Sequence, residues 1–380
     1  MPKGPTTTRM TYAHSGVDLD AKDRFTDSLE SIMRRTHTPR VIRNPGGFAG
    51  LFRLDYKQRL FARNYKDPVL VACTDGCGTK VKLAAQLKKF DTIGIDLVAM
   101  NVNDLIVQGG EPLLFLDYIA VPRVDPAMLT DIVRGVAEGC RRAGCSLIGG
   151  ETAEMPDVYR EGDFDLAGFA VGVVELKRAM NPTRVRIGDV VLGLESDGIH
   201  SNGYTLVRKV VQSAGLDLNA VHPELHDARR HGGTKARRAK KNGNDGAALT
   251  LGEVLLAPTR IYAGPIVKLQ RNYRVKNVIS GMAHITGSGL AGNLERALHK
   301  GVDARIDTTS WEPPPVFRFI QAHGGIDEPE MRRVFNMGIG YTLIVRRTFA
   351  ESVAEQLSRY GERVHQIGRI VKGSGRVIEE

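Results

Sequence analysis

The stretch GIDLVAMNVNDLIVQGGEPLLFLDYIAV, residues 94–121, indicates the fold class most directly. In its first half, over 94–108, Val98, Val102 and Leu105 recur at positions i, i+4 and i+7, which is the spacing of one face of a helix. From residue 113 onward the side chains form an apolar run of strand length. A helix that leads into a buried strand is typical of α/β folds, in which helices cover a sheet.

Segments on both sides continue this alternation. The ones that we predict before residue 180 are a strand at 68–73, a helix at 126–143 and a strand at 166–175. Residues 180–189 combine proline, polar residues and a glycine, which is typical of a link, and a second series of strands and helices follows. We therefore predict an α/β (α+β) fold with two domains, residues 1–180 and 181–380.

The composition is that of a globular chain with a basic balance. The 380 residues include 53 Lys and Arg against 43 Asp and Glu, a formal charge of +10, and 42 glycines. Half of the positive excess lies in residues 227–246, which we interpret as a solvated basic insert because large apolar side chains are almost absent. Nucleic-acid binding by this insert is the alternative, but it lacks the aromatic side chains that stack on bases.

Several locations and classes are disfavoured. No apolar run approaches the roughly 18 residues that a membrane span needs, and the N-terminus has no apolar signal-peptide core. Four cysteines in a chain of this length do not form a disulfide scaffold. We therefore expect a cytoplasmic protein without a membrane partner.

Polar turns that contain glycine follow predicted strands at 74–80, 149–154, 196–203, 283–289 and 336–340. A further polar pair, Asn103-Asp104, lies on the helix predicted at 94–108. Carboxylates beside such turns suit Mg²⁺, and Gly-Ser-Gly at a helix start suits a phosphate group. The P-loop sequence G-x-x-x-x-G-K-[ST] and the sequence H-E-x-x-H are absent. The pattern therefore predicts a nucleotide and a phosphate-bearing ligand without a P-loop or an H-E-x-x-H metal site.

Long blocks of the chain resemble the phosphoribosylformylglycinamidine cyclo-ligase family, also called AIR synthetases. The blocks are YAHSGVDLDAKDRF (12–25), GGFAGLF (46–52), TDGCGTK (74–80), DTIGIDLVAMNVNDLIVQGGEPLLFLDYIA (91–120), GCRRAGCSLIGGETAEMPDVY (139–159), DLAGFAVGVVE (165–175), SDGIHSNGYTLVRKV (196–210), LLAPTRIY (255–262), AHITGSGLAGNL (283–294) and VFNMGIGYTLIV (334–345). The family's reaction closes the imidazole ring of formylglycinamidine ribonucleotide with ATP and yields 5-aminoimidazole ribonucleotide, ADP and phosphate. The alternative is a sister enzyme of the same superfamily, of the selenophosphate synthetase or small-molecule kinase type.

The resemblance also implies an architecture. It implies a homodimer in which the N-terminal domains, carrying the ATP site, meet in a barrel-like sheet, and a C-terminal α/β sandwich. ATP and Mg²⁺ are the expected cofactors, and formylglycinamidine ribonucleotide is the expected small-molecule substrate. No nucleic acid is required for this reaction, so we expect none as a partner.

The resemblance assigns site residues by matching motifs. It implies metal binding by Asp75 and Asp104, and proton transfer or oxygen contact by His200 and His284. The implied nucleotide contacts are Asp75, Asp91 or Asp96, Asp104, Gly149, Gly150 and Glu151. The implied substrate contacts are Ser201, Asn202, Thr286, Gly287 and Gly289.

Two features depart from the family pattern. Ser288 stands where the family usually has the second of three glycines after AHIT. A serine there requires a negative φ, or a hydroxyl that joins the phosphate site. The basic insert at 227–246 has no family counterpart that we can place.

Overall fold

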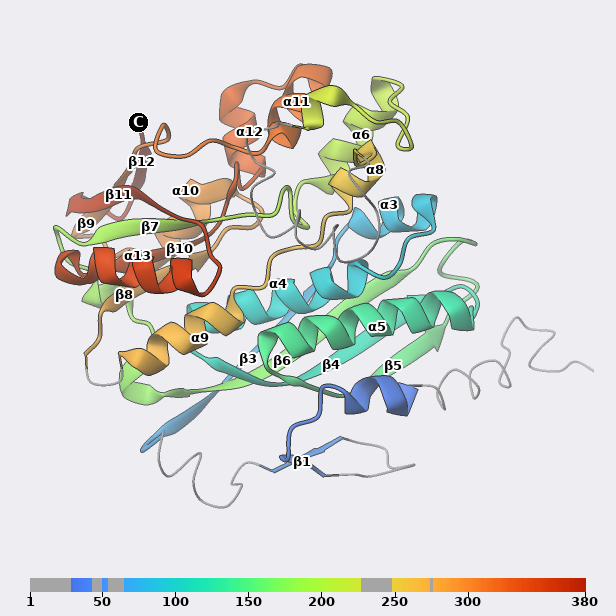
Figure 1. Ribbon diagram of the computed structural model, residues 1–380, viewed down its shortest axis with the longest axis horizontal. Helices are drawn as coiled ribbons and strands as arrows, with labels where there is room; N and C mark the ends of the chain where they lie inside the picture. Colours follow the sequence, from blue (N-terminus) through green and yellow to red (C-terminus); the bar gives the residue numbers. More distant parts are fainter. Residues whose placement is uncertain (1–28, 43–49, 54–64, 227–247, 274–275) are drawn as a thin grey trace, which may run out of the picture.

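The computed structural model describes residues 29–42, 50–53, 65–226, 248–273 and 276–380, arranged around two principal sheets (Figure 1). The basic insert predicted at 227–246 lies outside the described residues. Within the described ranges, each helix is too short or too polar to cross a bilayer.

A four-stranded sheet organises the N-terminal half. Its strands, in order across the sheet, are β3 (Pro68–Gly76), β6 (Asp165–Glu175), β4 (Glu111–Val121) and β5 (Ser146–Glu154). β6 is antiparallel to both β3 and β4, and β4 is parallel to β5. The C-terminal ends of β3, β4 and β5 therefore lie along the same end of the sheet. A separate short pair is formed by β1 (Val41–Ile42) and β2 (Leu51–Phe52).

Helices cover one face of this sheet. The N-terminal half supplies α3 (Lys80–Leu87), α4 (Ile93–Val107) and α5 (Pro126–Ala143), and α9 (Ala263–Asn272) comes from the C-terminal half. Glycine lets α4 and α5 approach closely, because a Cβ at Gly94 would lie 2.3 Å from the carbonyl oxygen of Ile132. The apolar core under these helices continues into the C-terminal half.

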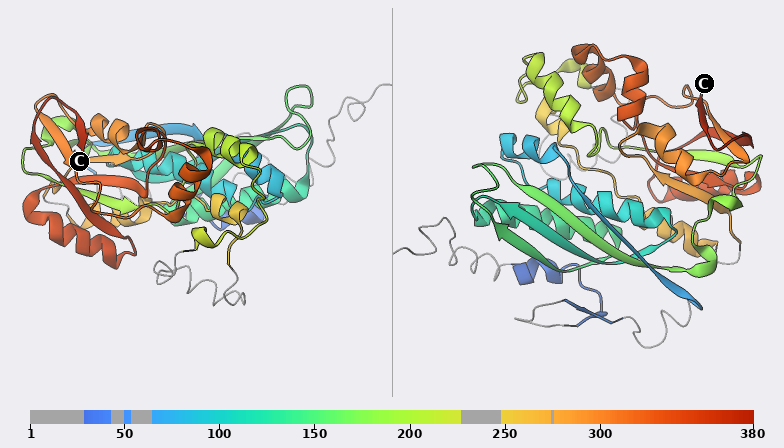
Figure 2. Two further views of the ribbon diagram at one scale, coloured as in Figure 1. Left: turned by 90° about the horizontal axis from the view of Figure 1, so that it is seen from above. Right: turned by 180° about the vertical axis from the view of Figure 1, so that it is seen from behind.

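The opposite face of the sheet is apolar and open. Seen from behind, the strands lie in front of α4 and α5 (Figure 2). Leu70 on β3, Phe169 on β6 and Tyr118 on β4 are 61%, 40% and 39% exposed. The strand register places Phe169 beside Thr74 and Leu116, so these side chains share this outer face.

A six-stranded sheet organises the C-terminal half. Its order is β12 (Val377–Glu379), β9 (Val302–Ile306), β11 (Val364–Lys372), β7 (Val190–Glu195), β10 (Ile339–Val345) and β8 (Ile279–His284). The remaining α-helices are α6 (Tyr204–Ser213), α8 (Leu251–Leu255), α10 (Gly289–Leu294), α11 (Pro315–Gly324), α12 (Glu328–Val334) and α13 (Ala350–Arg359). Alternate residues of β7 enter two cores: Leu192 joins the core shared with the N-terminal half, and Val191 packs with α10 on the other face. The sheet is thus covered on both faces.

Two of the predicted turns are wrong in part. β3 continues through Asp75 to Gly76, and residues 149–154 belong to strand β5. Glycine in β5 has a packing reason, because a Cβ at Gly150 would lie 1.6 Å from Oδ1 of Asp117 on the neighbouring strand. The glycine pair that suggests a turn is therefore a close approach inside the sheet.

Candidate active site

Three of the expected site residues approach one another where the two halves of the chain meet. Asp75 lies at the end of β3, Asp104 in the last turn of α4, and His284 at the end of β8. Nδ1 of His284 lies 2.8 Å from Oδ1 of Asp104. The His284 side chain is 1% exposed and that of Asp104 is 45% exposed, so a buried ring is paired with a carboxylate that solvent and ligands can reach.

The contacts of Asn103 define the orientation of the His284 ring. Oδ1 of Asn103 accepts the Tyr262 N–H at 2.9 Å, and its Nδ2 donates to the Arg260 carbonyl at 2.8 Å. The same Nδ2 lies 3.5 Å from Nε2 of His284. An amide donor near Nε2 and a carboxylate at Nδ1 favour the neutral tautomer that carries its proton on Nδ1. The basic lone pair is then on Nε2.

Asp75 shares the electrostatic environment of Asp104. Burial raises the pKa of the Asp75 carboxyl, and the negative charge of Asp104 raises it further, while the Gly76 N–H that donates at 2.8 Å opposes the shift. A carboxyl group whose ionisation is disfavoured by burial and by a neighbouring carboxylate is a suitable environment for a cation. Within the described residues, no three His, Cys, Asp or Glu side chains are grouped to hold a metal. The pair therefore fits Mg²⁺, which takes one or two carboxylates together with phosphate oxygens and water.

Asp96 lies in a different environment. It is fully buried and forms an ion pair with Lys80, whose Nζ lies 2.9 Å from Oδ1. The same ammonium donates to the carbonyl oxygens of His200 at 2.9 Å and Ala257 at 2.8 Å. Lys80 therefore ties helices of the N-terminal half to two segments of the C-terminal half. The motif TDGCGTK contains Lys80, but nothing in one sequence marks a lysine as buried.

Two further side chains complete this buried cluster. Oδ1 of Asp96 accepts the Thr259 N–H at 2.7 Å, the Thr259 hydroxyl at 2.6 Å and the Ser201 hydroxyl at 3.0 Å. Ser201 is 5% exposed. In this arrangement neither the Asp96 carboxylate nor the Ser201 hydroxyl is open to a ligand. Asp96 and Ser201 thus help to hold the two halves together, and the nucleotide and substrate contacts expected of them stay predictions.

His200 also occupies a structural position. It is 2% exposed and has a φ of 70°, in the left-handed region. Its Nε2 accepts the backbone N–H groups of Asp197 at 3.2 Å and Arg260 at 3.4 Å. A Cβ at Gly340 would lie 2.5 Å from Cε1 of this ring, so the ring is enclosed by backbone. The buried ring thus contacts the backbone of two segments, and the proton transfer expected of His200 stays a prediction.

The turn at 286–289 brings several expected substrate contacts together. Nδ2 of Asn293 donates to the carbonyl oxygens of Gly287 at 3.0 Å and Gly289 at 2.7 Å, and its Oδ1 accepts the Thr286 hydroxyl at 3.2 Å. The Asn202 amide lies 3.7 Å from where a Cβ at Gly287 would stand. Asn202 is therefore next to the turn, as a shared substrate loop requires. Nothing in the sequence pattern had marked Asn293.

Ser288 takes a backbone conformation that serine rarely adopts. Its φ is 82°, so the negative φ required of a serine here is absent. The next residue, Gly289, has a φ of 64°, and a Cβ there would lie 1.8 Å from the carbonyl oxygen of Arg332. Close backbone packing thus excludes a side chain at 289 and strains the one at 288.

The expected nucleotide contacts on β5 lie across the sheet from Asp75. The register aligns Asp75 with Gly168, Gly168 with Asp117, and Asp117 with Gly150. Three strand spacings separate Asp75 from Gly150, roughly 14 Å. Glu151 pairs with Tyr118, so its side chain lies on the outer face of the sheet, opposite that of Asp75.

Asp91 is separated from the same centre along α4. Asp91 and Asp104 are thirteen positions apart in the sequence, which corresponds to about 20 Å of helix. Oδ1 of Asp91 pairs with Lys89 Nζ at 3.0 Å on the surface. Asp91 and Asp104 therefore cannot hold the same phosphate group.

Two family models match the chain. The N-terminal domain of AIR synthase related proteins matches residues 61–174, and their C-terminal domain matches residues 186–379. Among solved structures, thiamine-monophosphate kinase from Stenotrophomonas maltophilia K279a has a TM-score of 0.61 and 18% identity over 92% of this chain and 95% of that one. The hydrogenase maturation protein HypE in complex with ATP has a TM-score of 0.58 and 18% identity over 93% of this chain and 91% of that one. Likeness at such identities shows a shared fold.

Curated relatives cover almost the whole chain. The phosphoribosylformylglycinamidine cyclo-ligase of Paraburkholderia phymatum is 45% identical over 361 residues, which are 95% of this chain and 92% of that protein. That of Burkholderia pseudomallei (strain 668) is 45% identical over 95% of this chain and 93% of that protein. With both domain models present in order, the chain belongs to the phosphoribosylformylglycinamidine cyclo-ligase (AIR synthetase) family, the purine-biosynthesis ligases that use ATP to close an imidazole ring.

Proposed function

We propose that Asp75, Asp104 and His284 form the centre at which this chain carries out the family's ring closure. The observation that carries the proposal is the 2.8 Å contact between His284 and Asp104, which joins the two matched domains beside a second carboxylate. In the reaction, the amide oxygen of formylglycinamidine ribonucleotide takes the terminal phosphoryl group of ATP, and ADP leaves. The amine nitrogen of the same molecule then attacks that carbon, loses a proton and displaces phosphate, which yields 5-aminoimidazole ribonucleotide.

Positioning and charge neutralisation dominate a phosphoryl transfer of this kind. Asp75 and Asp104 would hold Mg²⁺, which supplies positive charge to the phosphate oxygens when it is bound. With Nδ1–H directed to Asp104, Nε2 of His284 is basic. It can accept a proton once the Asn103 amide, which lies at the edge of hydrogen-bonding distance, gives way to substrate.

The turn at 286–289 is our proposed cradle for the substrate phosphate. Thr286 and Gly287 would present backbone N–H groups, Gly289 would let the backbone approach the phosphate, and Asn202 would add a side-chain amide from the neighbouring loop. Asn293 holds the carbonyl oxygens of Gly287 and Gly289 inward, and the Gly289 N–H itself donates to the Thr286 carbonyl oxygen at 3.2 Å. The turn and the Asp75–Asp104 pair would bind opposite ends of the reacting molecules.

The nucleotide-binding role of β5 fits a homodimer. Glu151 shares the outer face of the sheet with Tyr118, and this face carries the exposed Leu70 and Phe169. We propose that a second copy of the chain covers this face. Gly149, Gly150 and Glu151 would then reach ATP bound at the partner's site. Asp91 remains a candidate contact for a more distant part of the nucleotide.

We also propose a boundary between the domains and a location for the protein. The domain boundary would lie near residue 180, in the link between the two matched segments. The cytoplasm would be the location, which is compatible with four free cysteines.

A direct assay tests the function and the site separately. Purified protein receives ATP, Mg²⁺ and formylglycinamidine ribonucleotide, and release of ADP and of aminoimidazole ribonucleotide is measured. We expect Asp75→Asn and Asp104→Asn to lower kcat by about 10²–10³-fold, the loss typical of removing one electrostatic contact to a transition state. Asp131→Asn, a surface carboxylate on α5 that is 46% exposed, is the matched control and should turn over normally.

The possible outcomes distinguish two failures. If the wild-type protein released neither product, the proposed reaction would be wrong. If it released both while Asp75→Asn and Asp104→Asn kept full turnover, the reaction would stand and the proposed centre would be wrong. Thermal unfolding of each variant verifies that the fold is retained.

A further inference from the structure

A pocket lies at the link between the two halves of the chain, away from the candidate active site. Its volume is about 480 Å³, which is within the range of small-molecule sites. It is lined at the start of β3 and the end of β6, where Pro68 pairs with Glu175. Asp75 lies seven strand positions further along β3, roughly 23 Å away. The pocket is thus separate from the Asp75, Asp104 and His284 centre.

The charged side chains of the pocket are mostly cationic. Five are basic and two are acidic; they are Lys66, Lys177, Arg178, Arg271 and Lys276, with Glu111 and Glu175. Both carboxylates already have partners. Glu111 accepts the Tyr65 hydroxyl at 3.0 Å and pairs with Arg271, and Glu175 accepts the backbone N–H of Lys66 at 2.7 Å. Within the described residues no ion pair involves Lys66, Lys177 or Lys276, so a positive potential remains.

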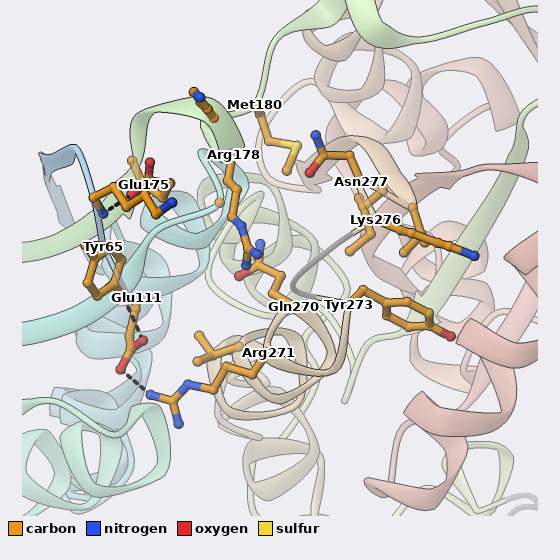
Figure 3. A pocket seen from close by; sticks show the side chains of 17 residues that line it. Tyr65, Glu111, Glu175, Arg178, Met180, Gln270, Arg271, Tyr273, Lys276 and Asn277 are labelled. Carbon is orange, nitrogen blue, oxygen red and sulfur yellow. Dashed lines mark hydrogen bonds and ion pairs between the residues drawn. The ribbon is translucent and has the colours of Figure 1, made fainter. Parts of the chain in front are cut away.

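The inner wall of the pocket is apolar. It is formed by buried aliphatic side chains and by Met180; the buried ones are Val174, Val267, Val278 and Ile279. Arg178 and Gln270 extend toward the middle of the pocket from opposite sides, and Asn277 lies at its upper rim (Figure 3). The guanidinium of Arg178 and the side-chain amides of Gln270 and Asn277 thus lie beside an apolar wall. This combination matches a molecule with an anionic head group and an apolar body.

We propose that this pocket binds a small organic anion, with an oxyanion head group on Arg178 and Gln270 and an apolar or aromatic body against the aliphatic wall. A phosphoryl group and a carboxylate share the chemistry that Arg178 recognises. Lys177 and Arg178 directly follow β6 and Met180 begins the link, whereas the wall includes Val267 and Ile279, so the bound anion would contact both halves of the chain. The inference is independent of the ring-closure assignment.

Calorimetric titration of the full chain tests the proposal. A saturating non-hydrolysable ATP analogue occupies the candidate active site, and three probes are then titrated: AMP for the phosphoryl head, indole-3-acetate for the carboxylate head, and adenosine as the neutral control. We expect at least one anion to bind at one site per chain with a Kd below about 1 mM, and adenosine to bind at least tenfold more weakly. Selective binding of AMP identifies a phosphoryl ligand, and selective binding of indole-3-acetate identifies a carboxylate.

Variants locate the binding. Arg178→Ala should weaken the affinity for the anion at least tenfold. Arg178→Lys keeps the positive charge but loses the planar guanidinium, so its affinity should lie between those of Arg178→Ala and the wild type. Lys209→Ala, an exposed lysine on α6, is the control and should bind as the wild type does. All three should close the ring at the wild-type rate without the probe. The proposal is overturned if neither anion binds more tightly than about 1 mM, if adenosine binds equally well, or if Arg178→Ala binds undiminished.

Discussion

Replacing Lys80 by methionine should destabilise the protein more than any conservative surface change. Lys80 is fully buried, and its ammonium donates to one carboxylate and two carbonyl oxygens. Methionine fills a similar volume but donates no hydrogen bond. Asp96 would then keep a buried negative charge with only the Thr259 and Ser201 donors. Its Oδ2 already has no hydrogen-bond partner within the described residues.

The magnitude follows from the burial of both charges. Breaking a buried ion pair by removing one partner costs about 3–5 kcal/mol, because the other charge is left uncompensated. The unfolding entropy is about 2.1 cal/mol/K per residue near 60 °C, so the 380 residues correspond to about 0.8 kcal/mol/K. The expected fall in Tm is therefore about 4–6 °C.

A double-mutant cycle separates the ion pair from a general packing defect. Thermal unfolding followed by circular dichroism is measured for Lys80→Met, Asp96→Asn and the double variant. We expect the double variant to lose at least about 2 kcal/mol less than the two single losses together, because neither buried charge remains. Lys82→Met is the control; this lysine is 40% exposed in its pair with Asp163 and should change the free energy of unfolding by less than about 1 kcal/mol.

Two results would refute this reasoning. One is a loss of less than about 1 kcal/mol of unfolding free energy in Lys80→Met, which is no more than a surface ion pair contributes. The other is additivity of the two single variants, which would mean that the charges do not interact.

Three further predictions concern residues beside the site. Burial raises the pKa of Asp117 to about 7 from its ordinary 3.8, so the folded chain keeps it protonated up to about pH 7 while the unfolded chain ionises it. The wild type should therefore lose stability relative to Asp117→Asn by about 2–3 kcal/mol between pH 5 and pH 8, and a pH-independent difference in unfolding free energy would contradict this. Gly150→Ala should lower the free energy of unfolding by about 1–3 kcal/mol, because the new Cβ would lie 1.6 Å from Oδ1 of Asp117. Gly149→Ala is the control, because the atom nearest to its new Cβ is 3.4 Å away. Equal losses of unfolding free energy in urea for the two variants would count against the packing explanation. Ser288→Gly should stabilise by roughly 0.5–1 kcal/mol through relief of a φ of 82°, and a lower Tm in that variant would show that the serine side chain contributes contacts that outweigh the strain.

Local periodicity was sufficient for the elements with the strongest patterns. The apolar repeat at 94–108 predicts α4 to within one residue of its observed bounds, and the repeat at 126–143 matches α5. Short segments were less well predicted. The strand expected at 68–73 continues to Gly76 in β3, and the second series of strands and helices was predicted without bounds, so those of α11, α12 and β8 come from the structure. An apolar run of five or six residues does not distinguish the end of a strand from the loop beside it.

The sequence by itself determined the α/β class, the family and the set of motifs that hold the site. Tertiary structure alone decided which motif residues are partly exposed beside the proposed centre and which are buried between the two halves. Asp96 and Asp104 lie eight residues apart on α4. Asp96 is fully buried in an ion pair with Lys80, whereas the Asp104 side chain is 45% exposed beside His284. Helical spacing places both side chains on the same helix, but their surroundings include segments more than 100 residues away in the chain, such as Thr259 beside Asp96 and His284 beside Asp104. Burial and partners depend on such long-range packing, which no local pattern encodes.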